Sequence, residues 1–154
     1  MIRGVHHVAI STPSLDRLSE FYQNAIGFEL VAQISWPEGT QAINQVLGLK
    51  DSSARQAMLK LGNICLELFE FETPTPEPMD PNRPVANHGH THLCLDVTNI
   101  EQVYEDLVKH GVTFHTPPQD FGTVKATYGR DPDGNVFEIQ ELLTSDDPSK
   151  IFNN

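Results

Sequence analysis

The sequence has few cysteines and no long apolar segment. Only Cys65 and Cys94 occur among the 154 residues, which excludes the disulfide framework of a small secreted domain. We interpret both as buried thiols in a reduced protein. No segment approaches the roughly 20 apolar residues that a membrane helix requires, and the N-terminal residues show no export signal. We therefore expect a cytoplasmic protein that does not enter the membrane.

Basic residues are also scarce. The chain has ten Lys and Arg against 21 Asp and Glu, and its formal net charge is -11. The basic side chains are too scattered to neutralise successive phosphates, so we do not expect nucleic acid as a partner. A length of 154 residues with 38% hydrophobic content is typical of one globular domain with a single core.

The chain contains two copies of one pattern. The segment His7–Ile10 returns at His92–Leu95, a displacement of 85 positions (92 minus 7). Each copy continues into apolar residues at helical spacing, beginning at Leu15 and at Ile100. The repetition predicts two similar modules, each with an amphipathic helix after its first strand.

Local signals mark where these helices begin and end. Thr98 and Glu101 have the spacing of a capping box at the start of the second helix. Gly27 and Gly111 stand where each helix should end in a left-handed cap. We expect strand structure to resume directly after both glycines.

Each copy ends in a predicted hairpin. The first runs over residues 57–71 with a turn at Gly62-Asn63, and the second over 124–141 with a turn at 131–134. The sequence therefore predicts an α+β fold of two tandem βαβββ modules, forming a cup or open barrel. We place the first module at about 4–72 and the second at about 88–143.

Two segments interrupt this regularity. Prolines recur through residues 73–84, which predicts an extended linker between the modules. The first module also contains an insertion at residues 36–53, in which 40–49 has the pattern of a short helix. We interpret the insertion either as a lid or substrate wall or as a decorative loop.

Strand alternation assigns four side chains to equivalent faces of the two modules. If the helices cover the apolar faces, the uncovered faces carry His7, Glu67, His92 and Glu138. A single strand histidine is more often a hydrogen-bonded core residue than a ligand. The repetition of a histidine–glutamate pair in both copies favours one shared metal site. His6 is expected to point into the helix-covered layer or to a sheet edge.

Two imidazoles and two carboxylates suit one divalent metal ion, which could be Zn, Ni, Co, Mn or Fe. This ligand set leaves one or two positions of an octahedral shell for water or substrate. Such an open shell is typical of a catalytic site rather than a closed structural one.

The chain resembles the vicinal oxygen chelate superfamily, which includes glyoxalase I, over about residues 5–143. The resemblance rests on His7-Val8-Ala9-Ile10, Phe21-Tyr22 before Ile26-Gly27-Phe28, Glu67, His92, and Asp131-Pro132-Asp133-Gly134-Asn135 leading to Glu138. The resemblance implies that paired modules form a cup around one metal ion held by His7, Glu67, His92 and Glu138. It places Phe21 and Tyr22 in the helix core.

The ligand set is most similar to that of glyoxalase I. The resemblance implies a metal-dependent isomerase or lyase that chelates a carbonyl and a hydroxyl oxygen and moves a proton through an enediolate. Glu138 and Glu67 are then the candidate catalytic bases, and we favour Glu138. Three alternatives remain open: an acyl-CoA epimerase, an Fe-dependent extradiol dioxygenase and a metal-free binding or resistance protein.

The expected substrate is a small molecule with vicinal oxygens and a fairly apolar remainder. Apolar neighbours such as Phe69 and Val136 suggest a more hydrophobic substrate than a glutathione hemithioacetal. Arg55, Lys125 and Arg130 are possible partners for glutathione carboxylates, or are simply solvated surface residues. The resemblance also favours a homodimer, with the cup formed either within one chain or from modules of two chains.

Overall fold

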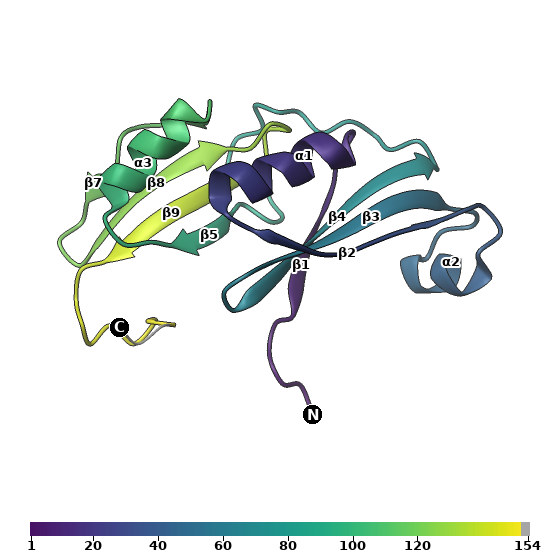
Figure 1. The fold of residues 1–154 in the computed structure, drawn as a ribbon, viewed down its shortest axis with the longest axis horizontal. Coiled ribbons are helices and arrows are strands. Elements are labelled where there is room, and N and C mark those ends of the chain that lie inside the picture. Colours follow the sequence, from purple (N-terminus) through teal and green to yellow (C-terminus); the bar gives the residue numbers. More distant parts are fainter. Residues whose placement is uncertain (152–154) are drawn as a thin grey trace. The chain divides into compact units, whose positions relative to one another are not determined.

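The computed structural model describes residues 1–151 and divides the chain into two compact units. The first unit spans Met1–Met79, and the second begins at Asp80. The boundary lies within the proline-rich segment 73–84. Each unit contains one sheet with strands of mixed direction, and the molecule is of the α+β class (Figure 1).

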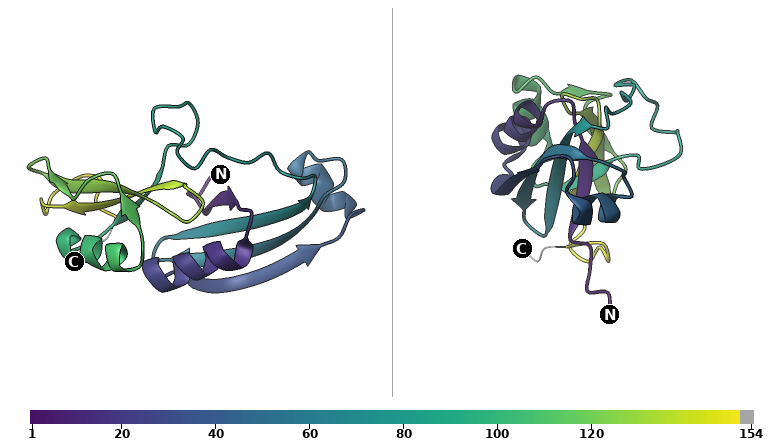
Figure 2. Two further views of the ribbon diagram at one scale, coloured as in Figure 1. Left: turned by 90° about the horizontal axis from the view of Figure 1, so that it is seen from above. Right: turned by 90° about the vertical axis from the view of Figure 1, so that its right-hand side faces the viewer.

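The first unit combines a four-stranded sheet with helical segments. Its elements are β1 (His7–Ser11), α1 (Leu15–Phe21), the π-helix η1 (Tyr22–Ile26), β2 (Glu29–Trp36), α2 (Gln41–Leu47), β3 (Ser53–Leu61) and β4 (Ile64–Thr73). The strand order is β1-β4-β3-β2, in which β1 runs parallel to β4 and the other neighbours are antiparallel. The helices α1 and α2 lie on opposite sides of this sheet (Figures 1 and 2).

The second unit repeats this plan without the inserted helix. Its elements are β5 (Leu93–Asp96), α3 (Ile100–Lys109), β6 (Thr113–Phe114), β7 (Gln119–Asp120), β8 (Val124–Arg130) and β9 (Val136–Leu142). The order is β5-β9-β8-β6, with β5 parallel to β9, and β7 also pairs with β8. The two-residue strand β7 was not predicted, because two residues carry no detectable alternation.

Helix α1 covers the apolar face of the first sheet. Its Leu15 and Leu18 are fully buried, and the helix packs against β3 and β4. The predicted helix widens into a π-helical turn after Phe21, where the Gly27 amide donates to the carbonyl of Tyr22. Gly27 then ends it at φ 95°, a left-handed conformation that favours glycine. Tyr22 is 1% exposed, as expected for a core residue.

The predicted capping box at Thr98–Glu101 is wrong. The N-cap of α3 is Asn99, at φ 57°, and it makes no side-chain cap hydrogen bond. The Glu141 carboxylate on β9 instead accepts hydrogen bonds from the backbone amides of Asn99 and Ile100. A sequence window around the helix start cannot reveal a capping group that lies 41 residues away.

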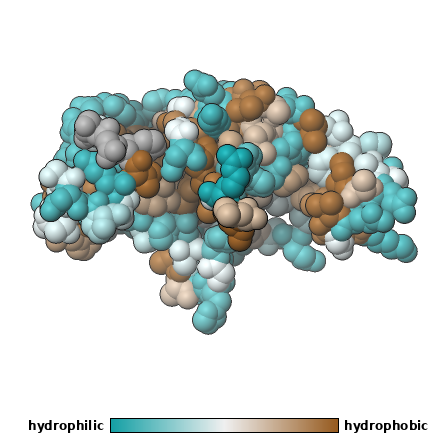
Figure 3. All heavy atoms as spheres, turned by 90° about the horizontal axis from the view of Figure 1, so that it is seen from below, coloured by the Kyte–Doolittle hydropathy of each residue, from teal (hydrophilic) through white to brown (hydrophobic). Residues whose placement is uncertain are grey.

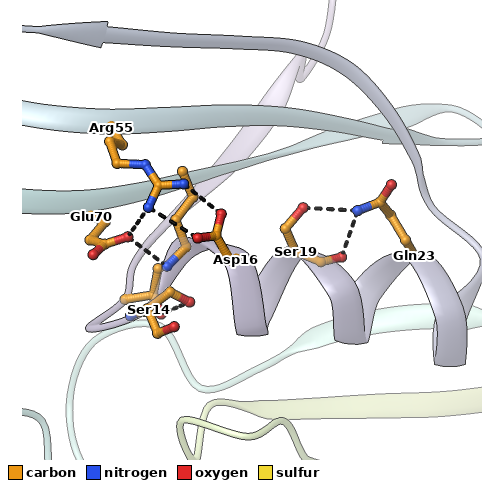
Figure 4. Close-up of polar contacts among 8 residues, drawn as sticks. Ser14, Asp16, Ser19, Gln23, Arg55 and Glu70 are labelled. Atoms are coloured by element: carbon orange, nitrogen blue, oxygen red, sulfur yellow. Dashed lines mark hydrogen bonds and ion pairs between the residues drawn. The ribbon is translucent and has the colours of Figure 1, made fainter.

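The first unit anchors its helix in the same way. Glu70 on β4 accepts a hydrogen bond from the Leu15 amide at 2.9 Å, and Arg55 on β3 bridges Glu70 to Asp16 in the first turn (Figure 4). The hydrogen bond from Arg55 holds the pKa of Asp16 below its usual range. A carboxylate at a helix N-terminus also complements the helix dipole.

The second unit contains the corresponding ionic contact. Lys125 on β8 pairs with Glu101 in the first turn of α3 and stands opposite Glu141 in the sheet. The hydrogen bond from Lys125 lowers the pKa of Glu101. The duplication therefore extends to the contacts that hold each helix start to its sheet.

Large apolar side chains remain exposed on the first unit. Val31 and Ile34 on β2 are 59% and 54% exposed, and Val46 on α2 is 87% exposed. Figure 3 shows hydrophobic residues in several separate groups among hydrophilic ones. Among the described residues, no helix has the length and apolar character needed to cross a membrane.

Candidate metal centre

The first histidine–glutamate pair meets on the sheet face opposite α1. His7 begins β1 and Glu67 lies on the neighbouring parallel strand β4, and the distance between His7 Nε2 and Glu67 Oε2 is 3.2 Å. The flanking Leu66 and Leu68 are buried on the other face. The strand alternation used in the sequence analysis therefore assigned these faces correctly.

Glu67 has a second partner that the sequence analysis did not identify. The side-chain amide of Gln56 on β3 donates a hydrogen bond to Glu67 Oε1 at 2.9 Å. Gln56 is only 6% exposed, so this contact is sheltered from water. Each Glu67 oxygen thus faces a nitrogen, with Oε1 fixed by Gln56 and Oε2 directed at His7.

The second unit brings its own pair together. The distance between His92 Nε2 and Glu138 Oε2 is 3.0 Å, where His92 directly precedes β5 and Glu138 lies on β9. The two glutamate side chains are similarly sheltered, with 17% of Glu67 and 15% of Glu138 exposed. The same interaction therefore occurs in both copies.

The surroundings of Glu138 differ from those of Glu67. Cys94 on β5 stands opposite Glu138 in the parallel register and forms a side-chain hydrogen bond with it. Partial desolvation of the Cys94 sulfur and the Glu138 charge raise the pKa of the thiol to about 12, although the residue as a whole is exposed, so the thiol stays protonated at neutral pH. Tyr128 lies opposite Glu138 on β8, and burial likewise raises its pKa.

Two cysteine expectations need revision. Cys94 is exposed on its sheet face and Cys65 is partly buried, so neither is the fully buried thiol that was expected. The short apolar runs around both cysteines suggested burial. Alternation shows on which face of a sheet a residue lies, but it does not show how well an uncovered face is shielded from solvent. Both cysteines are free thiols.

His7 and His92 each contact the preceding residue through the second ring nitrogen, Nδ1. The Nδ1 atom of His7 lies 2.9 Å from Nδ1 of His6, and that of His92 lies 2.9 Å from Oγ1 of Thr91. Such contacts fix the orientation of an imidazole and leave Nε2 for a ligand. Of the two positions expected for His6, the structure supports the sheet edge, because His6 is exposed and directly precedes the edge strand β1.

The donor atoms suit a divalent metal ion. Metal–nitrogen and metal–oxygen bonds of about 2.1 Å at right angles separate adjacent ligand atoms by about 3 Å. The separations of 3.2 Å and 3.0 Å in the two pairs match that spacing. Within residues 1–151, the side chains form no group of three or more His, Cys, Asp and Glu that could hold a metal, and the histidine–glutamate contact in each unit is a pair.

The three candidate basic residues for glutathione carboxylates are engaged elsewhere. Arg55 and Lys125 form the ion pairs at the starts of α1 and α3. Arg130 donates hydrogen bonds to the main-chain carbonyls of Pro81, Arg83 and Gly134. These contacts give all three side chains structural roles. The interpretation that they bind the carboxylates of glutathione therefore loses its support.

The family model described as the Glyoxalase/Bleomycin resistance protein/Dioxygenase superfamily matches residues 4–139. A 2-epi-5-epi-valiolone epimerase from Actinomyces sp is 33% identical over 106 residues, which cover 68% of this chain. The matched part is 57% of that epimerase, so the chain spans little more than half of its length.

Two further proteins match along nearly the whole chain. A lactoylglutathione lyase from Neisseria meningitidis is 24% identical over 143 residues, which are 92% of each chain. The crystal structure of a glyoxalase family protein from Bacillus cereus superposes with a TM-score of 0.81 at 26% identity, covering 94% of this chain and 96% of that one. The fold described above is therefore the fold of the Bacillus cereus protein.

Proposed function

The chain belongs to the Glyoxalase/Bleomycin resistance protein/Dioxygenase superfamily, and we propose that its two histidine–glutamate pairs together hold one divalent metal ion. The observation that carries this proposal is the repeated contact of 3.2 Å and 3.0 Å between Nε2 and Oε2 in the two units. The ligands of the proposed site are His7, Glu67, His92 and Glu138. They meet either within one chain or between units of two chains in a homodimer.

The proposed reaction is proton transfer at a carbon next to a carbonyl, as in a glyoxalase-type isomerase or lyase. The bound metal would polarise a carbonyl oxygen and a neighbouring hydroxyl oxygen of the substrate, which makes the adjacent carbon more acidic. The protein must then supply a base close to that carbon. Glu67 and Glu138 are the two carboxylates available at the site.

Glu138 is the better candidate for the base. Gln56 fixes Glu67 through a hydrogen bond of 2.9 Å, which favours a constant role as ligand. The position equivalent to Gln56 in the second unit is Ala126, which has no side-chain donor. Glu138 instead contacts the Cys94 thiol on β5, a weak hydrogen-bond donor. Glu138 therefore has more freedom to leave its resting position and accept a proton from the substrate.

A second candidate is epimerisation by the same two carboxylates. The relative that is 33% identical is named an epimerase, and epimerisation also starts with removal of a proton next to a carbonyl. In that reaction one glutamate would remove the proton and the other would return a proton to the opposite face. The two reactions share the first proton removal. They differ in the carbon atom, or the face of that atom, to which a proton is then added.

Solvent exchange tests this proposal. The metal-loaded protein is incubated in D2O with the hemithioacetal of phenylglyoxal or with an acyl thioester, and the proton next to the carbonyl is followed by NMR. We expect metal-dependent loss of that proton signal, which disappears when a chelator removes the metal. Consumption of O2 with a catechol, without any exchange, would contradict the proposal and favour ring-cleaving chemistry.

A further inference from the structure

The face of the first sheet that carries Glu67 also carries aromatic side chains, beginning one step further along β4. The cross-strand register aligns Glu67 with Met58, and the next row aligns Phe69 with Gln56. The row after that aligns Phe71 with Ala54. Successive residues on one face of a strand lie about 7 Å apart. The rings of Phe69 and Phe71 therefore begin one row beyond the proposed ligand.

These two rings belong to an ordered aromatic cluster. Phe69 and Phe71 are stacked, with ring centroids 5.5 Å apart and planes inclined by 23°. Trp36 on β2 packs edge-on against both, at centroid distances of 6.1 Å. Trp36 is only 6% exposed, whereas the two phenylalanines are partly exposed. The accessible surface of the cluster is therefore contributed by the phenylalanines.

The insertion of the first unit holds this cluster in place. The Trp36 indole donates to Oγ of Ser52 at 3.0 Å, and Ser52 donates to Oδ1 of Asn44 at 2.6 Å. Ser52 is fully buried and Asn44 is 7% exposed. Asn44 lies on α2, so the inserted helix fixes the orientation of the indole that supports the two phenylalanines.

The corresponding rows of the second sheet carry different side chains. The position equivalent to Phe69, two residues after the glutamate, is Gln140, which pairs with Ala126 and Asp96. Leu142 replaces Phe71 in the following row, opposite Val124. The stacked phenylalanines therefore belong to the first unit, whereas the ring beside the pair of the second unit is Tyr128, whose centroid lies 4.7 Å from that of His92.

We infer that Phe69 and Phe71 form a binding surface for a flat apolar group of the substrate, next to the atoms held at Glu67. The inference rests on the proposed function, because the metal must fix the substrate oxygens for this group to reach the phenylalanines. A flat ring suits the surface because stacked aromatic contacts add to the free energy gained by removing apolar area from water. The insertion thereby acts as a specificity element and not as a decoration.

A pair of chelators isolates the contribution of this surface. Benzohydroxamate and acetohydroxamate bind a metal through the same two oxygens, but only the first carries a ring. Their dissociation constants for the metal-loaded protein are measured by calorimetry, and the fluorescence of Trp36, the only tryptophan, reports binding next to the cluster. We expect benzohydroxamate to bind about tenfold more tightly or better, and to change the Trp36 emission.

Two variants test the assignment to Phe69. Phe69→Gln introduces the residue type found at Gln140 and should bring the two affinities within about twofold of each other. Phe69→Leu keeps an apolar side chain without a ring and should give an intermediate ratio, which guards against a folding defect in the first variant. Phe121→Gln is the control, because Phe121 is 68% exposed in the second unit and lies outside this surface.

The outcomes separate this inference from the proposed function. Tight binding of benzohydroxamate that is lost selectively in Phe69→Gln supports the inference. Equal affinities for the two hydroxamates in the wild-type protein would overturn the inference and leave the metal site intact. Failure of both hydroxamates to bind the metal-loaded protein would overturn the proposed chelating function itself.

Discussion

Glu67 and Glu138 occupy equivalent positions on β4 and β9, but their neighbours differ. Glu67 accepts a hydrogen bond from the buried amide of Gln56, and the aromatic cluster around Phe69 follows in the next rows of the sheet. Glu138 lies beside the Cys94 thiol and opposite Tyr128. The two copies therefore share the pair itself and differ in what surrounds it.

The parts that the copies share are those that build the sheet and hold the helix. Both units place a glutamate of the last strand at the start of the helix, and both pair a basic residue with an acid in the first turn of the helix. The neighbours of the two histidine–glutamate pairs have diverged, and in the proposed site this difference assigns Glu67 the role of a fixed ligand and Glu138 the role of the base. The positions that anchor the helices are thus alike in the two units, whereas the positions around the histidine–glutamate pairs differ.

The largest expected effect comes from exchanging the two glutamates for glutamine. Glu138→Gln should lower the solvent-exchange rate by about 10³-fold, because general-base catalysis typically contributes 10² to 10⁴. Glu67→Gln should lower it by only about 10-fold to 100-fold, because the base remains and one ligand weakens. Both rates are measured by NMR at saturating metal. Equal losses in the two variants would contradict the division of roles.

Removal of the Ser52 hydroxyl should weaken the first unit. Ser52→Ala leaves the buried indole N–H of Trp36 without its acceptor, which typically costs about 1–3 kcal/mol. Urea unfolding followed by Trp36 fluorescence measures the change in the free energy of unfolding. Ser35→Ala, at an exposed position of β2, is the matched control and should be nearly neutral. An unchanged midpoint in Ser52→Ala would show that the insertion does not support the cluster.

A smaller effect is expected at the helix anchors. Glu141→Ala should lower the free energy of unfolding by about 1–2 kcal/mol, because two backbone amides lose their acceptor. Glu70→Ala should cost about half as much, since it removes the acceptor of one amide and Arg55 keeps its contact with Asp16. Circular dichroism during urea unfolding measures both variants. The control is Glu72→Ala, at an exposed position on β4. A larger loss of unfolding free energy in Glu70→Ala than in Glu141→Ala would contradict the expected order.

Much of the fold follows from sequence patterns of limited length. Apolar periodicity located α1 and α3, alternation located the hairpins β3–β4 and β8–β9, and the pattern at 40–49 located α2. The faces of Glu67 and Glu138 followed from the same alternation. These features depend on residues that are close together in the sequence, so they can be predicted from one sequence alone.

Contacts between distant residues could not be read in this way. Gln56 reaches Glu67 because of the register between two antiparallel strands, and Glu141 caps α3 across 41 residues. His6 lies just outside β1, where alternation does not apply. The partners of the candidate ligands, which decide how each of them behaves, therefore required the three-dimensional arrangement.

The central claim is that the pairs of the two units share one metal ion. Metal binding by the wild-type protein, His7→Ala and His92→Ala is measured by elemental analysis and by competition with a coloured chelator. We predict one ion per wild-type chain and an affinity loss of at least about 100-fold in either variant, because removing a ligand should cost at least as much as removing its supporting partner. Two ions per chain, or an affinity that depends on the histidine of only one unit, would contradict the claim.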